Sequence, residues 1–161
     1  MSFDAPSDLH LRGAGLRFGL VAARFNAELV DGLRVRARAV LVAAGVGEKD
    51  IVEVRVPGSH EVPWAAQQLA AAKRFDCVIA LGVLIGGDTN HHEMVGESVS
   101  HALQQVALGT GVPVINGVIV TDTLAQARAR CVGKIDRGAE FARAGLEMAT
   151  LRRTFRRSPK S

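Results

Sequence analysis

The sequence predicts a doubly wound α/β domain, in which a parallel β-sheet is covered by helices on both faces. Two observations predict it: four short, largely apolar segments resemble buried strands, and a helical segment follows each of them. Strands that are apolar throughout need cover on both faces, and helices between consecutive strands provide that cover. A length of 161 residues fits one domain with one core.

The alternation of strands and helices can be followed along the chain. Apolar runs, or apolar and polar residues in alternation, indicate strands at residues 17–23, 50–57, 77–85 and 112–121. Apolar positions at helical spacing, with glycine stops, indicate helices at residues 27–45, 61–74, 90–111, 123–133 and 139–155. We expect one domain over residues 16–155, preceded by a segment (1–15) that is extended or pairs with a neighbouring chain.

The net charge of +4 raises the question of a nucleic-acid partner. Much of the positive excess lies in the last ten residues, RRTFRRSPKS, which we expect to be a solvated basic tail, with residues 156–161 beyond the last helix. Aromatic residues that could stack on bases make up only 4% of the chain, which disfavours nucleic-acid binding. A small anionic substrate would use the same positive field.

Other features bear on the compartment of the protein. The N-terminus lacks the pattern of a secretory signal, and no apolar run approaches the ~20 residues of a membrane span, so we expect a cytoplasmic protein that does not contact membranes. Cys77 lies in a strand pattern and Cys131 in a helix pattern. We expect both to be buried thiols in a reducing compartment rather than a disulfide.

Ligands of doubly wound domains bind where strands end and helices begin, which directs attention to the loops ARFNAE, PGSHEVP, IGGDTNHH and VTDT. In the third loop, Gly86 and Gly87 allow a close backbone approach before a helix. Backbone amides at a helix start attract anions, so a phosphate could bind at Gly87, Asp88 and Thr89. The alternative is that Asp88 or Thr89 caps the helix.

His91 and His92 follow this loop and suggest either proton transfer or metal binding. Neighbouring residues on a helix point about 100° apart and do not chelate one ion together, and the residue at i+4 from His91 is Val95. Neither a CxxC nor an HExxH pattern occurs, so we expect no metal. A histidine at a strand-to-helix junction is either a proton carrier or a satisfied polar residue, and His91, nearer the loop, is the preferred candidate.

Three other side chains allow two interpretations each. Phe25 could stack on a flat heterocycle or pack in the core. Glu61 could bind a ligand or complement the dipole of the helix that it precedes. Arg130, near Lys134, could bind phosphate or face water. The absence of a GxGxxG pattern argues against a dinucleotide carrier.

Five segments in this order and spacing, ARFN, VPGSHEVP, ALGVLIGGDTNHHEMV, TGVPVINGVIVTDT and GAEFARAGLEMATL, resemble the 6,7-dimethyl-8-ribityllumazine synthase family over residues 16–155. The resemblance implies a flavodoxin-like domain that condenses 5-amino-6-(D-ribitylamino)uracil with 3,4-dihydroxy-2-butanone 4-phosphate, without metal or organic cofactor, in the penultimate step of riboflavin biosynthesis. The alternatives are a homologue that binds lumazine or flavin without turnover, and a homologue that only forms a shell.

The resemblance also implies roles for residues. His91 falls on the general acid and base, and Phe25 on the aromatic residue that stacks on the pyrimidine. The implied substrate-binding positions are Phe25, Asn26, Ser59, His60, Glu61, Leu84, Ile85, Gly87, Asp88, Thr89, Asn116 and Arg130. Of these, Gly87, Asp88, Thr89 and Arg130 are implied to bind phosphate, with Arg130 supplied by an adjacent subunit. The family forms pentamers with sites at subunit contacts, and twelve pentamers build a shell in some members.

The sequence departs from the family pattern at several of these positions. His60 stands where Phe or Tyr is usual, Gly86 replaces a common arginine, and Asn116 lies where many members have a Phe from the neighbouring subunit. Further departures are His92 and Met94 at positions that are often aromatic, and Arg137 near a customary lysine. These departures bear on substrate affinity and on the size of the assembly.

Overall fold

A computed structural model describes residue 7 and residues 9–157, so residues 1–6 and 8 of the segment 1–15 and the last four residues of the predicted tail lie outside its described part. Strands β1 (Phe18–Ala23), β2 (Ile51–Val56), β3 (Cys77–Ile85) and β4 (Val114–Thr121) form one parallel sheet in the order β2-β1-β3-β4. The helices are α1 (Ala27–Ala43), α2 (Val62–Ala71), α3 (His91–Thr110), α4 (Leu124–Cys131) and α5 (Arg137–Arg157), with 3-10 turns η1 (Glu48–Asp50) and η2 (Ser59–Glu61). The predicted α/β class and parallel sheet are confirmed.

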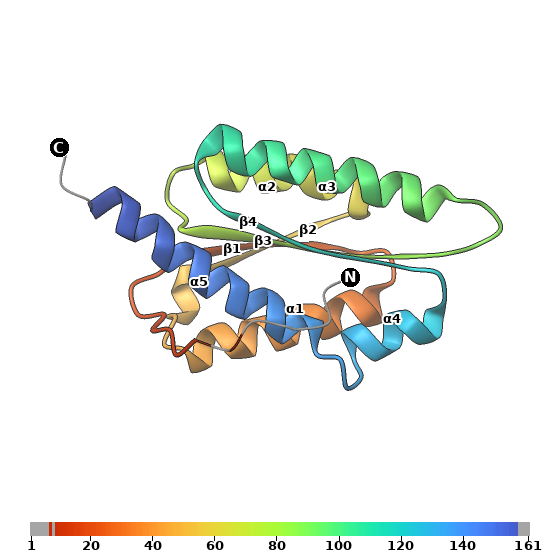
Figure 1. The fold of residues 1–161 in the computed structure, drawn as a ribbon, viewed down its shortest axis with the longest axis horizontal. Coiled ribbons are helices and arrows are strands. Elements are labelled where there is room, and N and C mark those ends of the chain that lie inside the picture. Colours follow the sequence, from red (N-terminus) through yellow and green to blue (C-terminus); the bar gives the residue numbers. More distant parts are fainter. Residues whose placement is uncertain (1–6, 8, 158–161) are drawn as a thin grey trace.

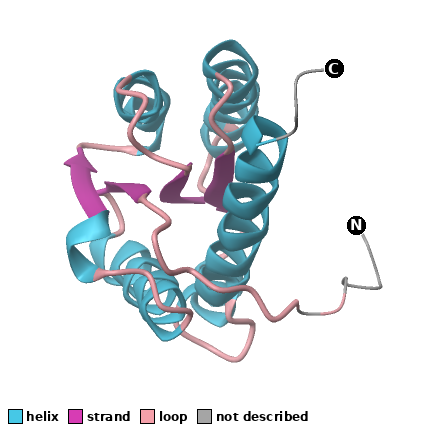
Figure 2. Cartoon of the chain, turned by 90° about the vertical axis from the view of Figure 1, so that its left-hand side faces the viewer, coloured by secondary structure: helices cyan, strands magenta, loops and turns pink. Residues whose placement is uncertain are grey.

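The helices form two layers, one on each face of the sheet. Helices α2 and α3 lie together on one face, while α1, α4 and α5 pack against one another on the other face (Figure 1). Viewed from the side, the strands lie between these layers (Figure 2). None of the described helices is long and apolar enough to cross a membrane.

The apolar strands of the sequence divide their side chains between two cores. In β1, Leu20 belongs to the core beneath α1 and α5, whereas its neighbour Val21 belongs to the core beneath α2 and α3. In β3, Ile79 and Ala80 divide in the same way. Successive side chains of a strand point to opposite faces, so a strand covered on both faces must be apolar at every position. This is why continuous apolar runs were a correct strand signal here.

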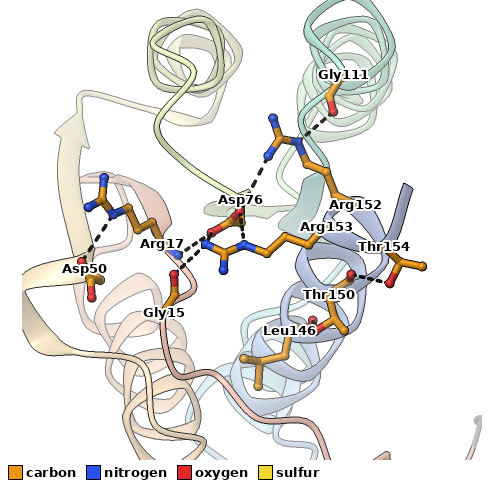
Figure 3. Close-up of polar contacts among 10 residues, drawn as sticks. All are labelled: Gly15, Arg17, Asp50, Asp76, Gly111, Leu146, Thr150, Arg152, Arg153 and Thr154. Atoms are coloured by element: carbon orange, nitrogen blue, oxygen red, sulfur yellow. Dashed lines mark hydrogen bonds and ion pairs between the residues drawn. The ribbon is translucent and has the colours of Figure 1, made fainter. Parts of the chain in front are cut away.

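The last helix ends two residues beyond its predicted end at residue 155, and the expectation that the basic residues from 152 onward are solvated is wrong for Arg152 and Arg153. Helix α5 continues to Arg157, and the guanidinium of Arg153 bonds the buried carboxylate of Asp76 at 2.9 and 3.0 Å (Figure 3). Arg152 lies 3.7 Å from the same carboxylate. A buried carboxylate must be paired, and its partners here come from the last turns of α5.

The predicted burial of both cysteines is confirmed, since Cys77 and Cys131 are buried free thiols. Burial raises the pKa of Cys131 to about 11 and raises the pKa of Cys77 further. The thiolate is the form that reacts with alkylating agents, so a raised pKa and burial both oppose the reaction at pH 8.

We therefore expect the native protein to resist iodoacetamide at pH 8 and to take up two labels per chain in denaturant. Intact mass measured over time checks this expectation. Rapid labelling of either cysteine under native conditions would mean that its helix or strand opens readily, in contradiction to the packing described here.

Candidate active site

The strand order reverses between β1 and β3, and the loops that follow these strands meet at the carboxyl edge of the sheet. The helix after β1 lies on one face and the helix after β3 on the other, and doubly wound domains bind ligands where the order reverses in this way. Asn26 bridges this point, because its side-chain amide donates a hydrogen bond to the carbonyl of Val83 at 2.9 Å. Asn26 also has a left-handed backbone (φ 57°), which asparagine adopts more readily than most residues.

The first two loops meet around Gly58. A Cβ placed on Gly58 would lie 3.0 Å from the ring of Phe25 and 3.3 Å from the carboxylate of Glu61, so ring and carboxylate border the same glycine. Phe25 is 71% exposed, which rules out the core-packing interpretation within this chain. Glu61 precedes α2 but its side chain makes no capping hydrogen bond there. Both side chains are therefore open to a ligand.

Ser59 lies deeper than its neighbours. It is buried, and a Cβ on Gly82 of β3 would lie 2.5 Å from its hydroxyl oxygen, so the absence of a side chain at Gly82 makes room for Ser59. The turn η2, which carries Ser59, packs against β3 and α3. His60, on the same turn, is exposed.

The third and fourth loops are joined to each other. The amide of Gly86 donates to the carbonyl of Thr121 at 2.8 Å, and Nε2 of His92 lies 3.2 Å from the carboxylate of Asp122. A Cβ on Gly86 would lie 2.6 Å from the carbonyl oxygen of Asp122. Any side chain at this position would have to move one of the two loops.

Helix α3 begins immediately after the third loop. Its N-cap is Asn90, whose side chain makes no capping bond, so the alternative that Asp88 or Thr89 caps the helix is wrong. Amides at the start of such a helix are available to an anion. The two histidines differ sharply: His91 is exposed at the open edge, whereas His92 is 9% exposed and tied to Asp122. Only His91 is accessible for proton transfer.

The structure does not bring every predicted site residue together within one chain. Leu84 and Ile85 are the last two residues of β3, directly before the third loop, and both are half-buried. Asn116 is exposed on the edge strand β4 and accepts a bond from the amide of Val118. Arg130 lies on α4, on the opposite face from α3, and its guanidinium donates to the carbonyl of Gln126 at 3.0 Å. Within residues 9–157, no hydrogen bond or ion pair joins Arg130 or Asn116 to the other predicted residues.

Asp122 and the structural role of His92 were missed by the sequence reasoning. A usable signal was the spacing Thr123-x-x-Gln126, a capping box that the structure confirms at the start of α4. The box fixes the loop just before it, because the Gln126 side chain accepts from the amide of Asp122 at 2.9 Å. His92, Glu93 and Asp122 also place possible ligand atoms within 4.8 Å of one another, a smaller set than the four ligands of a structural zinc site.

The close contact at Gly86 leads to a test with an adjacent control. Gly86→Ala should lower the free energy of unfolding by about 1–3 kcal/mol, the usual cost of overpacking, because the new methyl group meets the Asp122 backbone. Gly87→Ala should change it by less than about 0.5 kcal/mol, since no atom lies within 4 Å of a Cβ there. Denaturant unfolding of both variants measures the difference. Equal stabilities would show that the two loops are not in close contact.

The fold and this edge define the class of protein: a doubly wound α/β domain with an exposed aromatic ring, carboxylate and imidazole in the loops that follow its strands. The particular family is shown by comparison with known proteins. A model of the 6,7-dimethyl-8-ribityllumazine synthase family matches residues 15–153, and the chain belongs to that family.

Individual relatives are similar over nearly their whole length. The chain is 43% identical to the 6,7-dimethyl-8-ribityllumazine synthase of Nitrosospira multiformis over 91% of this chain and 89% of that protein. It is 47% identical to the enzyme of the same name from Kineococcus radiotolerans, over 91% of each chain. The resemblance derived from the five sequence segments is thereby confirmed.

Proposed function

We propose that the chain condenses 5-amino-6-(D-ribitylamino)uracil with 3,4-dihydroxy-2-butanone 4-phosphate to form 6,7-dimethyl-8-ribityllumazine, phosphate and water, the penultimate step of riboflavin biosynthesis. The observation that carries this proposal is the family match across residues 15–153. The exposed ring, carboxylate and histidine at the carboxyl edge of the sheet support it, because the reaction needs a flat amine to be held beside a proton carrier.

The proposed chemistry assigns a task to each part of the edge. Phe25 stacks on the pyrimidine ring, and Glu61 accepts hydrogen bonds from the ribityl hydroxyls. The free amine of the uracil attacks the ketone and loses water to give an imine, phosphate leaves, and the ribityl-bearing nitrogen closes the ring with loss of a second water. His91 carries protons to and from these groups, and holding both substrates in place lowers the barrier further.

The phosphate of the second substrate needs cationic partners. The amides of Gly87, Asp88 and Thr89 at the start of α3 supply partial positive charge. Arg130 supplies a guanidinium, whose planar donors match a phosphate. Because α4 and α3 lie on opposite faces of one chain, the Arg130 of this site is proposed to come from a second copy of the chain.

Exposed apolar side chains near the site support this second copy. Trp64 on α2 is 71% exposed, Met94 on α3 is 62% exposed, and Leu124 on α4 is 50% exposed. Large apolar groups that gather on a surface usually mark a contact with another molecule. We therefore propose a homo-oligomer of at least five chains with its active sites at subunit contacts, as the family resemblance implies.

Turnover is tested by mixing the purified protein with both substrates and following lumazine absorbance together with released phosphate. Product and phosphate should appear in equal amounts. An intact assembly that forms no product above the uncatalysed background would refute the proposed activity and would favour a binding or shell-forming homologue.

The two-chain site has a sharper test, because His91→Ala and Arg130→Ala damage different halves of it. In an assembly built from equal amounts of both variants, about a quarter of the contacts would pair an intact His91 with an intact Arg130 if the two come from different chains. Activity at low butanone phosphate should then rise well above that of either variant alone. If both groups came from one chain, every site would stay damaged and mixing would restore nothing.

A further inference from the structure

A second charged hollow lies at the other edge of the sheet, where β1 and β3 begin. Its volume is ≈ 320 Å³, and its lining includes the carboxylate of Asp76 and six cationic side chains, Arg17, Lys73, Arg74, Arg152, Arg153 and Arg156. We call this hollow the arginine pocket. Figure 3 shows Arg152 and Arg153 directed at Asp76, which also meets the backbone amide of Arg17, while the Arg17 guanidinium points toward Asp50.

The single carboxylate inside the pocket is already satisfied. Asp76 accepts two bonds from Arg153, at 2.9 and 3.0 Å, and one from the backbone amide of Arg17 at 2.8 Å. Arg153 is held further by the carbonyl of Gly15 at 2.6 Å. Asp76 therefore fixes the position of Arg153 but has little capacity left to neutralise the remaining cations.

Arg152 and Arg74 are also held in place by separate contacts. Arg152 donates to the carbonyl of Gly111 at 3.2 Å, and the guanidinium of Arg74 lies 5.0 Å from the centre of the Phe75 ring. Lys73 has a left-handed backbone (φ 58°) at the turn after α2. Within residues 9–157, Lys73, Arg74 and Arg156 have no ion pair with a carboxylate, and Arg17 meets Asp50 only at 3.6 Å.

Isolated surface cations are usually solvated and need no ligand. The arginine pocket differs because several of its cations are fixed by separate contacts and because they face one hollow with too few carboxylates. Like charges held together repel one another, so an anion between them is favoured. Guanidinium groups match phosphate oxygens with paired hydrogen bonds, which a monovalent ion such as chloride cannot use as fully.

We propose that the arginine pocket binds a small polyphosphate anion, either free diphosphate or the phosphate chain of a nucleotide. Its size lies at the lower end of the range of small-molecule pockets, about 300–1,000 Å³. The pocket lies at the opposite edge of the sheet from His91, so binding there does not compete with the substrates of the proposed reaction.

Titration calorimetry on the assembled protein tests this proposal with inorganic pyrophosphate as the probe. Arg130→Ala serves as the background, because it weakens phosphate binding at the proposed active site. Pyrophosphate should bind once per chain, and adding Lys73→Asn and Arg156→Ala should raise its dissociation constant at least about tenfold. Asparagine is chosen because it tolerates the left-handed backbone of Lys73.

Arg157→Ala is the matched control, since Arg157 is the next residue on α5 and does not line the pocket. It should change the dissociation constant by less than about twofold, because an exposed charge outside the pocket is screened by salt. An equal effect of Arg157→Ala and Arg156→Ala, or no saturable binding, would overturn the proposal and indicate only diffuse surface charge.

Two further measurements separate the possible sources of the anion. A nucleoside triphosphate that binds more tightly than pyrophosphate would assign the pocket to a nucleotide, and equal or weaker binding would assign it to the free anion. Tighter binding of a short single-stranded oligonucleotide than of either would overturn a small-anion site. Lys73→Asn with Arg156→Ala should leave lumazine formation unchanged, so failure of this proposal is distinguishable from failure of the proposed enzyme activity.

Discussion

His91→Ala should lower the turnover number about 10- to 100-fold, near the lower end of what a general acid or base contributes, because the groups that position both substrates remain. His91 is exposed at the first position of α3, so its removal leaves no core cavity. The assembly and its thermal stability should therefore be unchanged. Steady-state rates from lumazine absorbance, together with the native mass of the particle, measure both parts of the expectation.

Two variants make this result specific to proton transfer. His91→Gln keeps a polar side chain that cannot exchange protons near neutral pH, so it should be as slow as His91→Ala. His101→Ala removes another exposed histidine of α3, one that lies 3.9 Å from Glu97, and should have wild-type turnover. A fully active His91→Gln variant would show that the residue only positions the substrate.

The fold was predictable because its signals are local and repeat along the chain. Continuous apolar runs followed by helical periodicity indicated strands covered on both faces. For the strand from Cys77 to Ile85, both the first and the last residue were predicted correctly. The role of the basic residues at the end of α5 was not predictable in this way. The run RRTFRR has the composition of a solvated surface, and only the long-range contact with Asp76 shows that Arg153 pairs with a buried carboxylate.

The candidate site was predictable in part, for a similar reason. Loops at the carboxyl ends of strands can be found from element order alone, and these identified Phe25, Glu61 and His91. The bond between His92 and Asp122 joins residues 30 positions apart and depends on the register of β3 with β4. Sequence patterns of one chain do not specify such pairs. The placement of Arg130 beside a second chain stays a prediction, because it depends on a neighbouring subunit.

The arginines around Asp76 link the stability of the domain to the proposed anion site. In the native chain, Asp76 joins the start of β3, the start of β1 and the end of α5 through the bonds of Arg17 and Arg153. Without this carboxylate the cations would face one another with no counterion inside the pocket. A polyphosphate bound there would replace part of the missing negative charge, so the two proposals can be tested on the same variant.

Asp76→Ala should lower the free energy of unfolding by about 2–3 kcal/mol, somewhat less than the 3–5 kcal/mol for breaking a fully buried pair, because the arginines are partly exposed. Asp50→Ala is the control: its partner Arg17 is 58% exposed at 3.6 Å, so the loss should stay below about 1 kcal/mol. Denaturant unfolding at one protein concentration compares the two, because assembly contributes to stability. Pyrophosphate should stabilise Asp76→Ala more than the unmodified chain, because the Asp76 carboxylate then no longer competes with pyrophosphate for the arginines. Equal losses in the two variants would mean that Asp76 contributes no more than a surface ion pair.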